Sequence, residues 1–343
     1  MKSNEKIEKN KVFFVLPFVN MISNYVRGEC LRGFEPNGWK FNFIKGNYPK
    51  ILDFFPARYF YRLYFFLVIV AQKTTQNSYI YFLTPQNPNV LFFLSKFLKR
   101  KVIIDIQDAI QSKELLGIKK ASRIIKNSDH VIFESEENSL FWSSVMNFNY
   151  SIIEDTPQHE NLYRNFILRK KKVIWVGSKQ TAVYLKNFHK EFKLFEEFGY
   201  SITLLGCDNE VANSFRHYGI NIRNIESYNR LQLAKELESS RISFIPMENS
   251  DLFNLRGNLK AKISMSYGCL TIASDLAMHK RLIKNSVNGF LFSNFDHLKI
   301  ILTKIEDIDF SRKVSESSNA FIVKNYSRKK HAKKLTDALM QIK

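Results

Sequence analysis

Cysteine is scarce in this sequence, and its distribution excludes two kinds of protein. The 343 residues include three cysteines, Cys30, Cys207 and Cys269, which lie far apart and form no CxxC pair. An odd number of widely spaced cysteines builds neither a disulfide framework nor a cysteine-rich zinc module, and it is typical of proteins from a reducing compartment. We therefore expect a cytoplasmic protein.

Long apolar runs are also missing. The longest, LYFFLVIVA at 63–71, has about half the length that a bilayer-crossing helix needs. The opening residues are charged, and the short apolar run behind them is typical of a core strand, so we expect neither a secretory signal nor a membrane span. The stretch 54–73 mixes aromatic residues with Arg58 and Arg62. It is interpreted either as a core helix or as a helix that docks on membrane headgroups.

Several catalytic signatures are absent as well. The sequence has no HExxH, no Walker loop, no GxSxG and no kinase signature, and its seven histidines are scattered. Asp307 and Asp309 form an Asp-x-Asp pair, but they come after the last expected strand, so we interpret them as part of a polar linker. No metal site is expected.

Acidic residues are the minority among the charged residues. The chain has 52 Lys and Arg against 32 Asp and Glu, which gives a formal net charge of +20. Residues 1–170 carry an excess of nine basic residues and the remainder an excess of eleven, so the charge is not confined to a tail. Such a field attracts phosphorylated substrates, anionic lipid headgroups or nucleic acid, although a lysine-rich composition without function gives the same number. Because no basic arm or recognised motif is present, we expect no nucleic-acid partner.

Short apolar strands alternate with amphipathic helical stretches along the whole chain. The expected strands lie at 12–18, 40–44, 79–83, 101–106, 130–134, 150–153, 173–177, 201–206, 220–225, 242–246, 270–274 and 289–292. Several are continuous apolar runs, as in parallel strands that helices cover on both faces. Residues 154–172 are polar and then basic, which indicates a linker. The pattern predicts an α/β protein with two Rossmann-like, doubly wound domains, 1–165 and 166–325.

The most informative segment is 256–292. A helix is expected to begin near Lys260, between two buried strands, and to end at Gly268, where a left-handed C-cap needs no Cβ. Its N-terminus is flanked by Arg256, Lys260 and Lys262. A basic helix N-terminus favours an anionic ligand such as a diphosphate.

This segment resembles the donor-binding region of glycosyltransferase family 4, retaining nucleotide-sugar enzymes of the GT-B fold. Members run Glu-Ala-Met-Ala-x-Gly-x-Pro, then a strand, then an Asn-Gly turn. The matching positions are Met265, Ser266, Gly268, Ala273, Ser274, Asn288 and Gly289. The ribose-binding Glu of the family falls at Ile263, and its Pro falls at Leu270. Because Ile263 cannot hydrogen-bond a ribose diol, either another group does so or donor binding is altered.

The resemblance implies two Rossmann-like domains that face each other across a cleft, with the C-terminal helix, 325–343, packed back on the first domain. It implies retaining, metal-independent transfer of a hexosyl unit from a nucleotide diphosphate sugar, with no cofactor. The implied acceptor is a glycan or a lipid-linked glycan of lipopolysaccharide or capsule synthesis. The implied setting is the cytoplasmic face of the plasma membrane, with peripheral contact to its anionic surface.

The resemblance also assigns donor-binding residues. They are Gly177, Lys179, Lys186, Arg256, Asn258, Lys260, Lys262 and Gly268. Lys179 and Lys186 lie nearest to the two basic residues with which the family neutralises the leaving diphosphate, while Ser178 stands where the family has Arg. The alternative for both is a pair of surface lysines on a lysine-rich helix.

Two carboxylates are candidate catalytic residues. Asp108 follows the strand 101–106, and it either orients the acceptor hydroxyl as a base or caps the next helix. Glu248 follows the strand 242–246, where the family places a Glu that contacts the donor sugar. For the acceptor, the resemblance points to Asn20 and Arg27 in the turn after the first strand; the alternative for Arg27 is an ordinary surface residue.

Two other functions compete with the transferase. One is a GT-B-shaped binding or scaffold subunit without activity, for which Ile263 in place of Glu is the evidence. The other is a basic nucleic-acid-binding protein, which the absence of a clustered basic arm disfavours.

Overall fold

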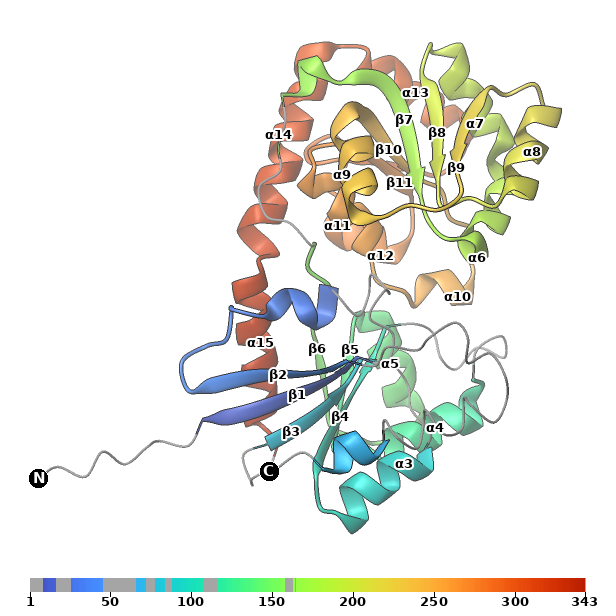
Figure 1. Ribbon diagram of the computed structural model, residues 1–343. Coiled ribbons are helices and arrows are strands. Elements are labelled where there is room, and N and C mark those ends of the chain that lie inside the picture. The colour runs from blue at the N-terminus through green and yellow to red at the C-terminus, as the bar shows by residue number, and fades with distance from the viewer. Residues whose placement is uncertain are drawn as a thin grey trace, which may run out of the picture. The chain divides into compact units, whose positions relative to one another are not determined.

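The computed structural model describes residues 9–16, 26–45, 66–71, 78–83, 88–107, 116–157, 163 and 165–342. Contacts divide the chain into two compact units. The first comprises Met1–Gln158, Leu255–Gly257 and Arg328–Lys343, and the second comprises His159–Asn254 and Asn258–Ser327. Each unit is built on one parallel sheet with helices around it (Figure 1).

The first unit contains a six-stranded parallel sheet with the order β2-β1-β3-β4-β5-β6. Its strands are β1 (Asn10–Leu16), β2 (Trp39–Lys45), β3 (Ser78–Phe82), β4 (Lys101–Ile106), β5 (His130–Phe133) and β6 (Tyr150–Ile152). Its helices are η1 (Glu29–Leu31), α3 (Pro88–Phe92), η3 (Phe93–Phe97), α4 (Ile118–Lys126), α5 (Glu136–Val145) and α15 (Arg328–Met340).

Strand β1 shows why this sheet needs helices on both faces. Its residues are buried from Val12 to Leu16 with no exposed position between them. Alternate side chains of a strand point to opposite faces. Accordingly, Phe14 packs in a cluster with Leu335 of α15, whereas Phe13 packs in a second cluster with Ile124 of α4.

The second unit contains a six-stranded parallel sheet with the order β12-β11-β10-β7-β8-β9. Its strands are β7 (Lys170–Val176), β8 (Ser201–Leu205), β9 (Ile222–Ile225), β10 (Ser240–Ile245), β11 (Leu270–Ser274) and β12 (Phe290–Phe292). Its helices are η4 (Phe166–Leu168), α6 (Lys179–Ala182), η5 (Val183–Phe188), α7 (His189–Glu197), α8 (Asn209–His217), α9 (Arg230–Ser239), α10 (Asp251–Asn254), α11 (Leu259–Ser266), α12 (Ala277–Leu282), α13 (Phe295–Ile305) and α14 (Ile308–Asn325).

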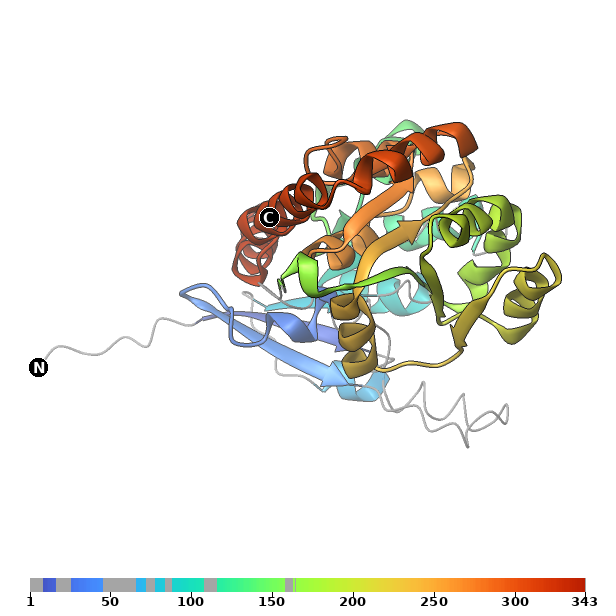
Figure 2. The ribbon, with the colours of Figure 1, turned by 90° about the horizontal axis from the view of Figure 1, so that it is seen from above.

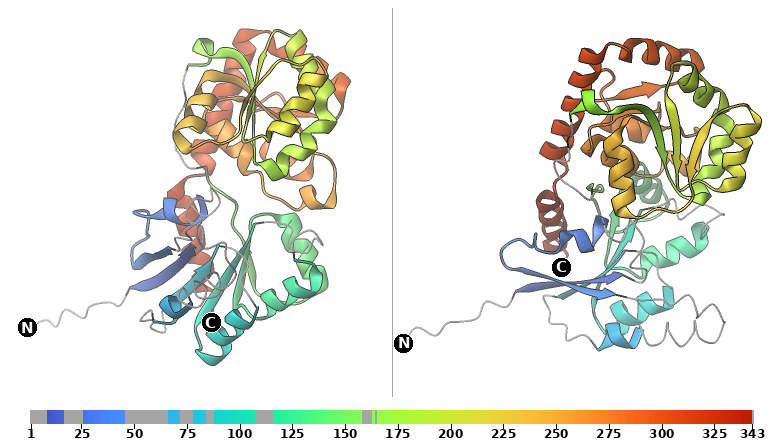
Figure 3. Two further views of the ribbon diagram at one scale, coloured as in Figure 1. Left: turned by 45° about the vertical axis from the view of Figure 1, so that its right-hand side comes forward. Right: turned by 45° about the horizontal axis from the view of Figure 1, so that its top comes forward.

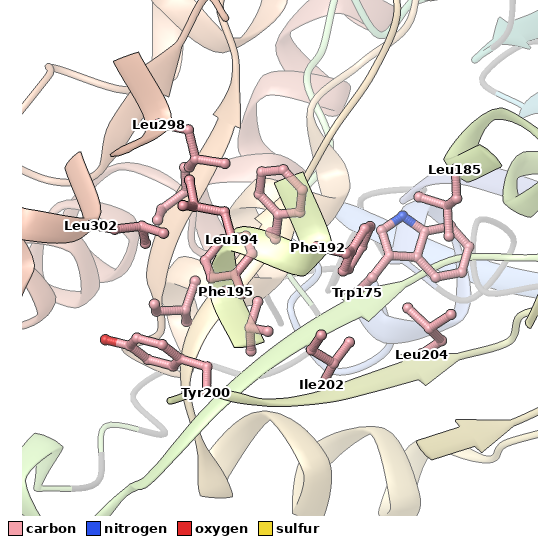
Figure 4. Packing of buried hydrophobic residues seen from close by; sticks show 14 of the residues in the cluster. Trp175, Leu185, Phe192, Leu194, Phe195, Tyr200, Ile202, Leu204, Leu298 and Leu302 are labelled. Atoms are coloured by element: carbon pink, nitrogen blue, oxygen red, sulfur yellow. The ribbon is translucent and has the colours of Figure 1, made fainter. Parts of the chain in front are cut away.

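Helices cover both faces of the second sheet. Within this unit, α9 lies on one side of the strands, and α7 and α8 lie on the other (Figures 2 and 3). Aromatic rings fill the core under α7, where Phe192 and Phe195 pack against Phe244 of β10 with ring centroids 5.3 and 4.9 Å apart. Trp175 of β7 lies in the same cluster (Figure 4).

The predicted fold class, two doubly wound parallel sheets, is confirmed. Each expected strand overlaps an observed one. The strands inside the sheets, such as β3, β4 and β11, are continuous buried runs, as expected of strands that helices cover on both faces. Of the stretch 54–73, residues 66–71 are described; they are helical over 66–70, with Ile69 buried and Leu67 54% exposed. In the described part of the chain, no helix combines the length and the apolar character that crossing a membrane requires.

Helix α11 ends as the sequence predicts. Gly268 has a φ of +71°, its N–H donates to the carbonyl of Met265, and the N–H of Cys269 donates to that of Ser264. This pair of bonds is a Schellman C-cap, which favours glycine at the left-handed position. A Cβ on Gly268 would also lie 2.7 Å from a ring carbon of Tyr163. Gly268 is therefore required both by its conformation and by the space around it.

Gly219 provides a matched control, because it closes α8 with a φ of +67° and a Cβ there would meet nothing within 4 Å. We expect Gly219→Ala to lower the free energy of unfolding by about 1 kcal/mol through backbone strain alone. Gly268→Ala is expected to lower it further, since Tyr163 must move as well. Urea denaturation of both variants measures the difference, and equal losses would contradict the steric argument.

Candidate functional site

The order of strands in the second unit places its candidate site. The chain runs outward from β7 to β8 and β9 on one side, and β10, β11 and β12 lie on the other side. In open α/β sheets, ligands bind at the carboxyl ends of strands where the order reverses in this way. Here that point lies between β7 and β10, which end at Val176 and Ile245.

The backbone after β7 is kept bare by glycine. The N–H of Gly177 continues the sheet by donating to the carbonyl of Leu205 at 2.9 Å. A Cβ on Gly177 would overlap the ring of Trp175, which folds under this residue, and would lie 2.8 Å from Oγ1 of Thr181. No side chain fits at this position, so the turn presents its backbone.

Lys260 reaches the same turn from α11. Its Nζ lies 3.4 Å from Oγ1 of Thr181 and 5.2 Å from the centroid of the Trp175 ring. Oγ1 of Thr181 also accepts a hydrogen bond from the N–H of Ser178 at 3.1 Å. The structure therefore brings together two predicted donor-binding residues, Gly177 and Lys260. Because the N–H groups of Gly177 and Ser178 already donate within the unit, the feature suited to a phosphate here is the positive charge of Lys260.

Lys179 and Lys186 lie in ion pairs on the surface of the second unit. Lys179 pairs with Glu226 and lies 3.7 Å from Asp208, while Lys186 lies 3.1 Å from Glu210. The hydrogen bond and negative charge of Glu226 raise the pKa of Lys179. The role of both lysines in donor binding stays a prediction.

Lys262 does not lie beside Lys260, although the sequence places both in one basic group at the start of α11. Its side chain is 0% exposed, and its Nζ lies 4.2 Å from the ring centroid of Tyr326, just after α14. Lys260, two residues earlier, points instead to Trp175 and Thr181. Residues two apart on a helix point in different directions, which the spacing of charges in the sequence does not reveal. The structure thus separates the two lysines.

Three more residues that were predicted to bind the donor, Asn258, Gly268 and Arg256, have defined places in the fold. Asn258, which precedes α11, donates from Nδ2 to the carbonyl of Met278 at 2.9 Å and is 6% exposed. Gly268 closes the opposite end of α11, about 12 Å along an eight-residue helix, and is enclosed. Arg256 belongs to Leu255–Gly257, which packs with the first unit. Gly268 therefore caps the end of α11 opposite to Lys260, and its role in donor binding stays a prediction.

Glu248 follows β10 and is half-buried. It accepts a hydrogen bond from Nδ2 of Asn187 in η5, a partner that the sequence did not indicate. Its role stays a prediction. Asp108 and Asn20, the other catalytic and acceptor candidates, lie outside the described residues.

His279 is a residue near the site that sequence reasoning missed. It is 1% exposed in α12, and its Nδ1 lies 2.8 Å from the carbonyl of Ser274, so Nδ1 carries the proton. Burial, together with the positive charge of Lys260, lowers the pKa of His279 to about 4. The histidine is therefore neutral at neutral pH, and it directly follows Met278, whose carbonyl accepts from Asn258 at the start of α11.

Arg27 in the first unit is neither a surface residue nor open to an acceptor. Its side chain is 0% exposed. Its Nε donates to Oδ2 of Asp105, and its Nη1 donates to Oδ1 of Asp155, both at 2.6 Å. Tyr81 also donates to Asp105. Burial raises the pKa of Asp105 to about 6, against the opposing charge of Arg27. The predicted acceptor contact is replaced by a buried ion-pair cluster.

Comparison with known proteins agrees with this architecture. No family model and no curated protein matches the chain. Among solved structures, HepE of Anabaena, in complex with UDP-glucose, is similar over 96% of this chain and 99% of its own, with a TM-score of 0.69 and 10% identity. The chain has the GT-B fold.

Two further structures support the assignment. The sucrose-phosphate synthase of Thermosynechococcus elongatus is similar over 97% of this chain and 99% of its own, with a TM-score of 0.69 and 13% identity. TarM of S. aureus, solved with UDP, is similar over 80% of this chain and 58% of its own, with a TM-score of 0.61 and 14% identity. Identities this low establish the fold alone. The described residues contain no group of three or more His, Cys, Asp or Glu arranged to hold a metal ion.

Replacing Arg27 tests the buried cluster. Arg27→Met leaves Asp105 and Asp155 buried without their cation, so we expect the free energy of unfolding to fall by about 3–5 kcal/mol. Arg32→Met is the control, since this exposed arginine lies over the Phe43 ring at 4.4 Å and contributes about 1 kcal/mol at most. Urea denaturation measures the free energy of unfolding of Arg27→Met and Arg32→Met. Equal values would contradict the assignment of Arg27 to a buried ion-pair cluster.

His279 predicts a pH dependence of stability. The unfolded chain binds the imidazole proton near pH 6.5, but the folded chain binds it only near pH 4, so folding is most favoured above pH 6.5 and weakens as the pH falls. Between pH 7 and 4.5 we expect wild type to lose about 2 kcal/mol more unfolding free energy than His279→Asn. His217→Asn is the control for the removal of an imidazole, since His217 is exposed. Parallel pH curves for wild type and His279→Asn would contradict this prediction.

Proposed function

We propose that this protein is a glycosyltransferase that moves a hexosyl unit from a nucleotide diphosphate sugar, with retention and without a metal ion. The observation that carries the proposal is that Lys260, Thr181 and the Gly177 turn lie together where the strand order of the second sheet reverses. The GT-B fold adds support, since HepE and TarM were solved with UDP or UDP-glucose.

The chemistry assigned to this cluster is electrostatic. When the bond from the sugar to the diphosphate breaks, negative charge grows on the departing oxygen, and fixed positive groups lower the energy of that state. Lys260 supplies a charge in the first turn of α11. The side chain of Asn258 is bonded to Met278, so it does not cap this turn. The backbone N–H groups of a helix N-terminus add to the attraction for a phosphate.

The donor sugar and the acceptor are assigned to other residues. Glu248, held by Asn187, is proposed to contact the donor sugar. Asp108 is proposed to orient the acceptor hydroxyl. The acceptor is proposed to be a glycan or a lipid-linked glycan of cell-surface polysaccharide synthesis, such as lipopolysaccharide or capsule. The proposed place of action is the cytoplasmic face of the plasma membrane, with peripheral attachment to its anionic surface.

A second function has one observation in its favour. Ile263 stands where the family has its ribose-binding Glu, and it packs among apolar side chains. A GT-B protein that has lost its donor site would act as a binding or scaffold subunit. Nucleotide binding separates the two functions, because the scaffold requires none.

Titration calorimetry with UDP, GDP, TDP and ADP tests the proposed donor site. We expect wild type to bind at least one diphosphate, and Lys260→Gln to bind it at least about tenfold more weakly, because a charge-assisted contact is lost. Lys299→Gln is the control, since this lysine is exposed on α13 in the same unit. Failure of wild type to bind any of the four would favour the scaffold. Equal binding by wild type and Lys260→Gln would remove Lys260 from the site.

A further inference from the structure

An apolar patch lies beside the proposed phosphate site. We define it by four partly exposed residues, Val176, Ile225, Tyr228 and Ile263. They pack on a buried cluster formed by Ile174, Leu205, Leu233, Leu237, Tyr267 and Cys269. The patch therefore has a rigid base, and its outer atoms remain accessible.

The patch and the phosphate site share their supporting residues. Val176 directly precedes Gly177, and the hydroxyl of Tyr228 donates to the carbonyl of Gly177 at 3.2 Å. Ile263 follows Lys260 by three residues on α11, so the two lie on neighbouring turns of one helix face. Most of α11 is buried, but Lys260 and Ile263 keep part of their surface. A diphosphate at Lys260 would place the attached nucleoside within reach of this patch.

Nucleosides are usually held by a carboxylate in doubly wound folds, because its two oxygens accept hydrogen bonds from the ribose diol. Four carboxylates follow strands at this edge: Asp208, Glu226, Glu248 and Asp275. Each already has a partner. Asp208 accepts from the N–H of Glu210, Glu226 pairs with Lys179, Glu248 accepts from Asn187, and Asp275 lies 3.3 Å from Lys280. At the apolar patch itself, α11 presents Ile263.

We propose that the patch holds the donor nucleoside by apolar contact and does not recognise its ribose 2′-hydroxyl. The donor class is then nucleoside diphosphate sugars of both the ribose and the 2′-deoxyribose series. This inference rests on the proposed function, since it concerns the same donor site. Ile263 is the specificity-determining residue, because a branched alkyl group gives no hydrogen bond whose loss would penalise the deoxy compound.

Matched pairs of nucleotides test the proposal by calorimetry: UDP with dUDP, GDP with dGDP, and ADP with dADP. For whichever base binds, we expect wild type to bind the two members within about threefold of each other, whereas a site built to bond a hydroxyl discriminates by about ten-thousandfold. A preference of wild type for the ribose member by more than about tenfold overturns the proposal.

Substitution of Ile263 supplies the converse test. Ile263→Glu adds a carboxylate acceptor, and we expect it to favour the ribose member by at least about tenfold. The new charge repels the diphosphate of both members of a pair equally, so this repulsion does not change the ratio of their dissociation constants. Ile263→Gln adds a neutral acceptor in case the charge prevents folding, and Ile263→Val keeps the ratio near one. A ratio unchanged in folded Ile263→Glu and Ile263→Gln overturns the assignment to Ile263.

The two proposals fail in different ways. If wild type binds no diphosphate of either series, the proposed function fails and this inference fails with it. If wild type binds diphosphates but strongly prefers the ribose member, the donor site stands and the inference about the patch is wrong.

Discussion

The candidate site in the second unit depends on the packing of one side chain, the indole of Trp175. The ring is 2% exposed and lies in the cluster that Phe192 and Phe195 also fill. It occupies the space that a side chain on Gly177 would need, and Lys260 lies over its face. The large core under α7 thus reaches the carboxyl edge of the sheet and sets both the bare turn and the position of the charge. Interiors are close-packed, so a smaller residue at 175 would loosen both.

In the first unit, buried charged residues hold two parts of the chain together. Arg27 joins β4, through Asp105, to the segment after β6, through Asp155 and the carbonyl of Ile153. Thr156, next in the chain, lies 3.2 Å from Nδ1 of His331 on α15. One arginine therefore fixes the segment on which the returning C-terminal helix packs. An ion pair in a core adds little net stability over apolar residues, but its geometry admits few alternatives, so we interpret the cluster as a device for fixing position.

Much of the fold was predictable from the sequence, and the reasons are physical. Strands buried on both faces need continuous apolar runs, and the left-handed end of α11 needs a glycine at 268, so both leave a local signal. Arg27 left none, since its partners at 105 and 155 are distant in sequence and only the fold brings them together. Lys260 and Lys262 look equivalent as letters, yet one faces the edge of the sheet and the other faces Tyr326. His279 was missed because a lone histidine carries no spacing that reveals burial.

Ile263 stands where the family has Glu, and we propose that it contacts the nucleoside of the donor. Lys260 is proposed to contact the diphosphate, which is a different part of the donor. The proposed phosphate site consists of Lys260, Thr181 and the Gly177 turn, none of which requires a carboxylate at 263. Ile263 instead joins Val176 and Tyr228 over the cluster under α9 and α11, where an unpaired carboxylate would lie against apolar side chains. Isoleucine at 263 is thus compatible with its surroundings, and it leaves the proposed phosphate site unchanged. The packing of Trp175 requires Gly177 whether or not a donor binds, so Lys260 is the residue whose position bears most directly on the proposed donor site.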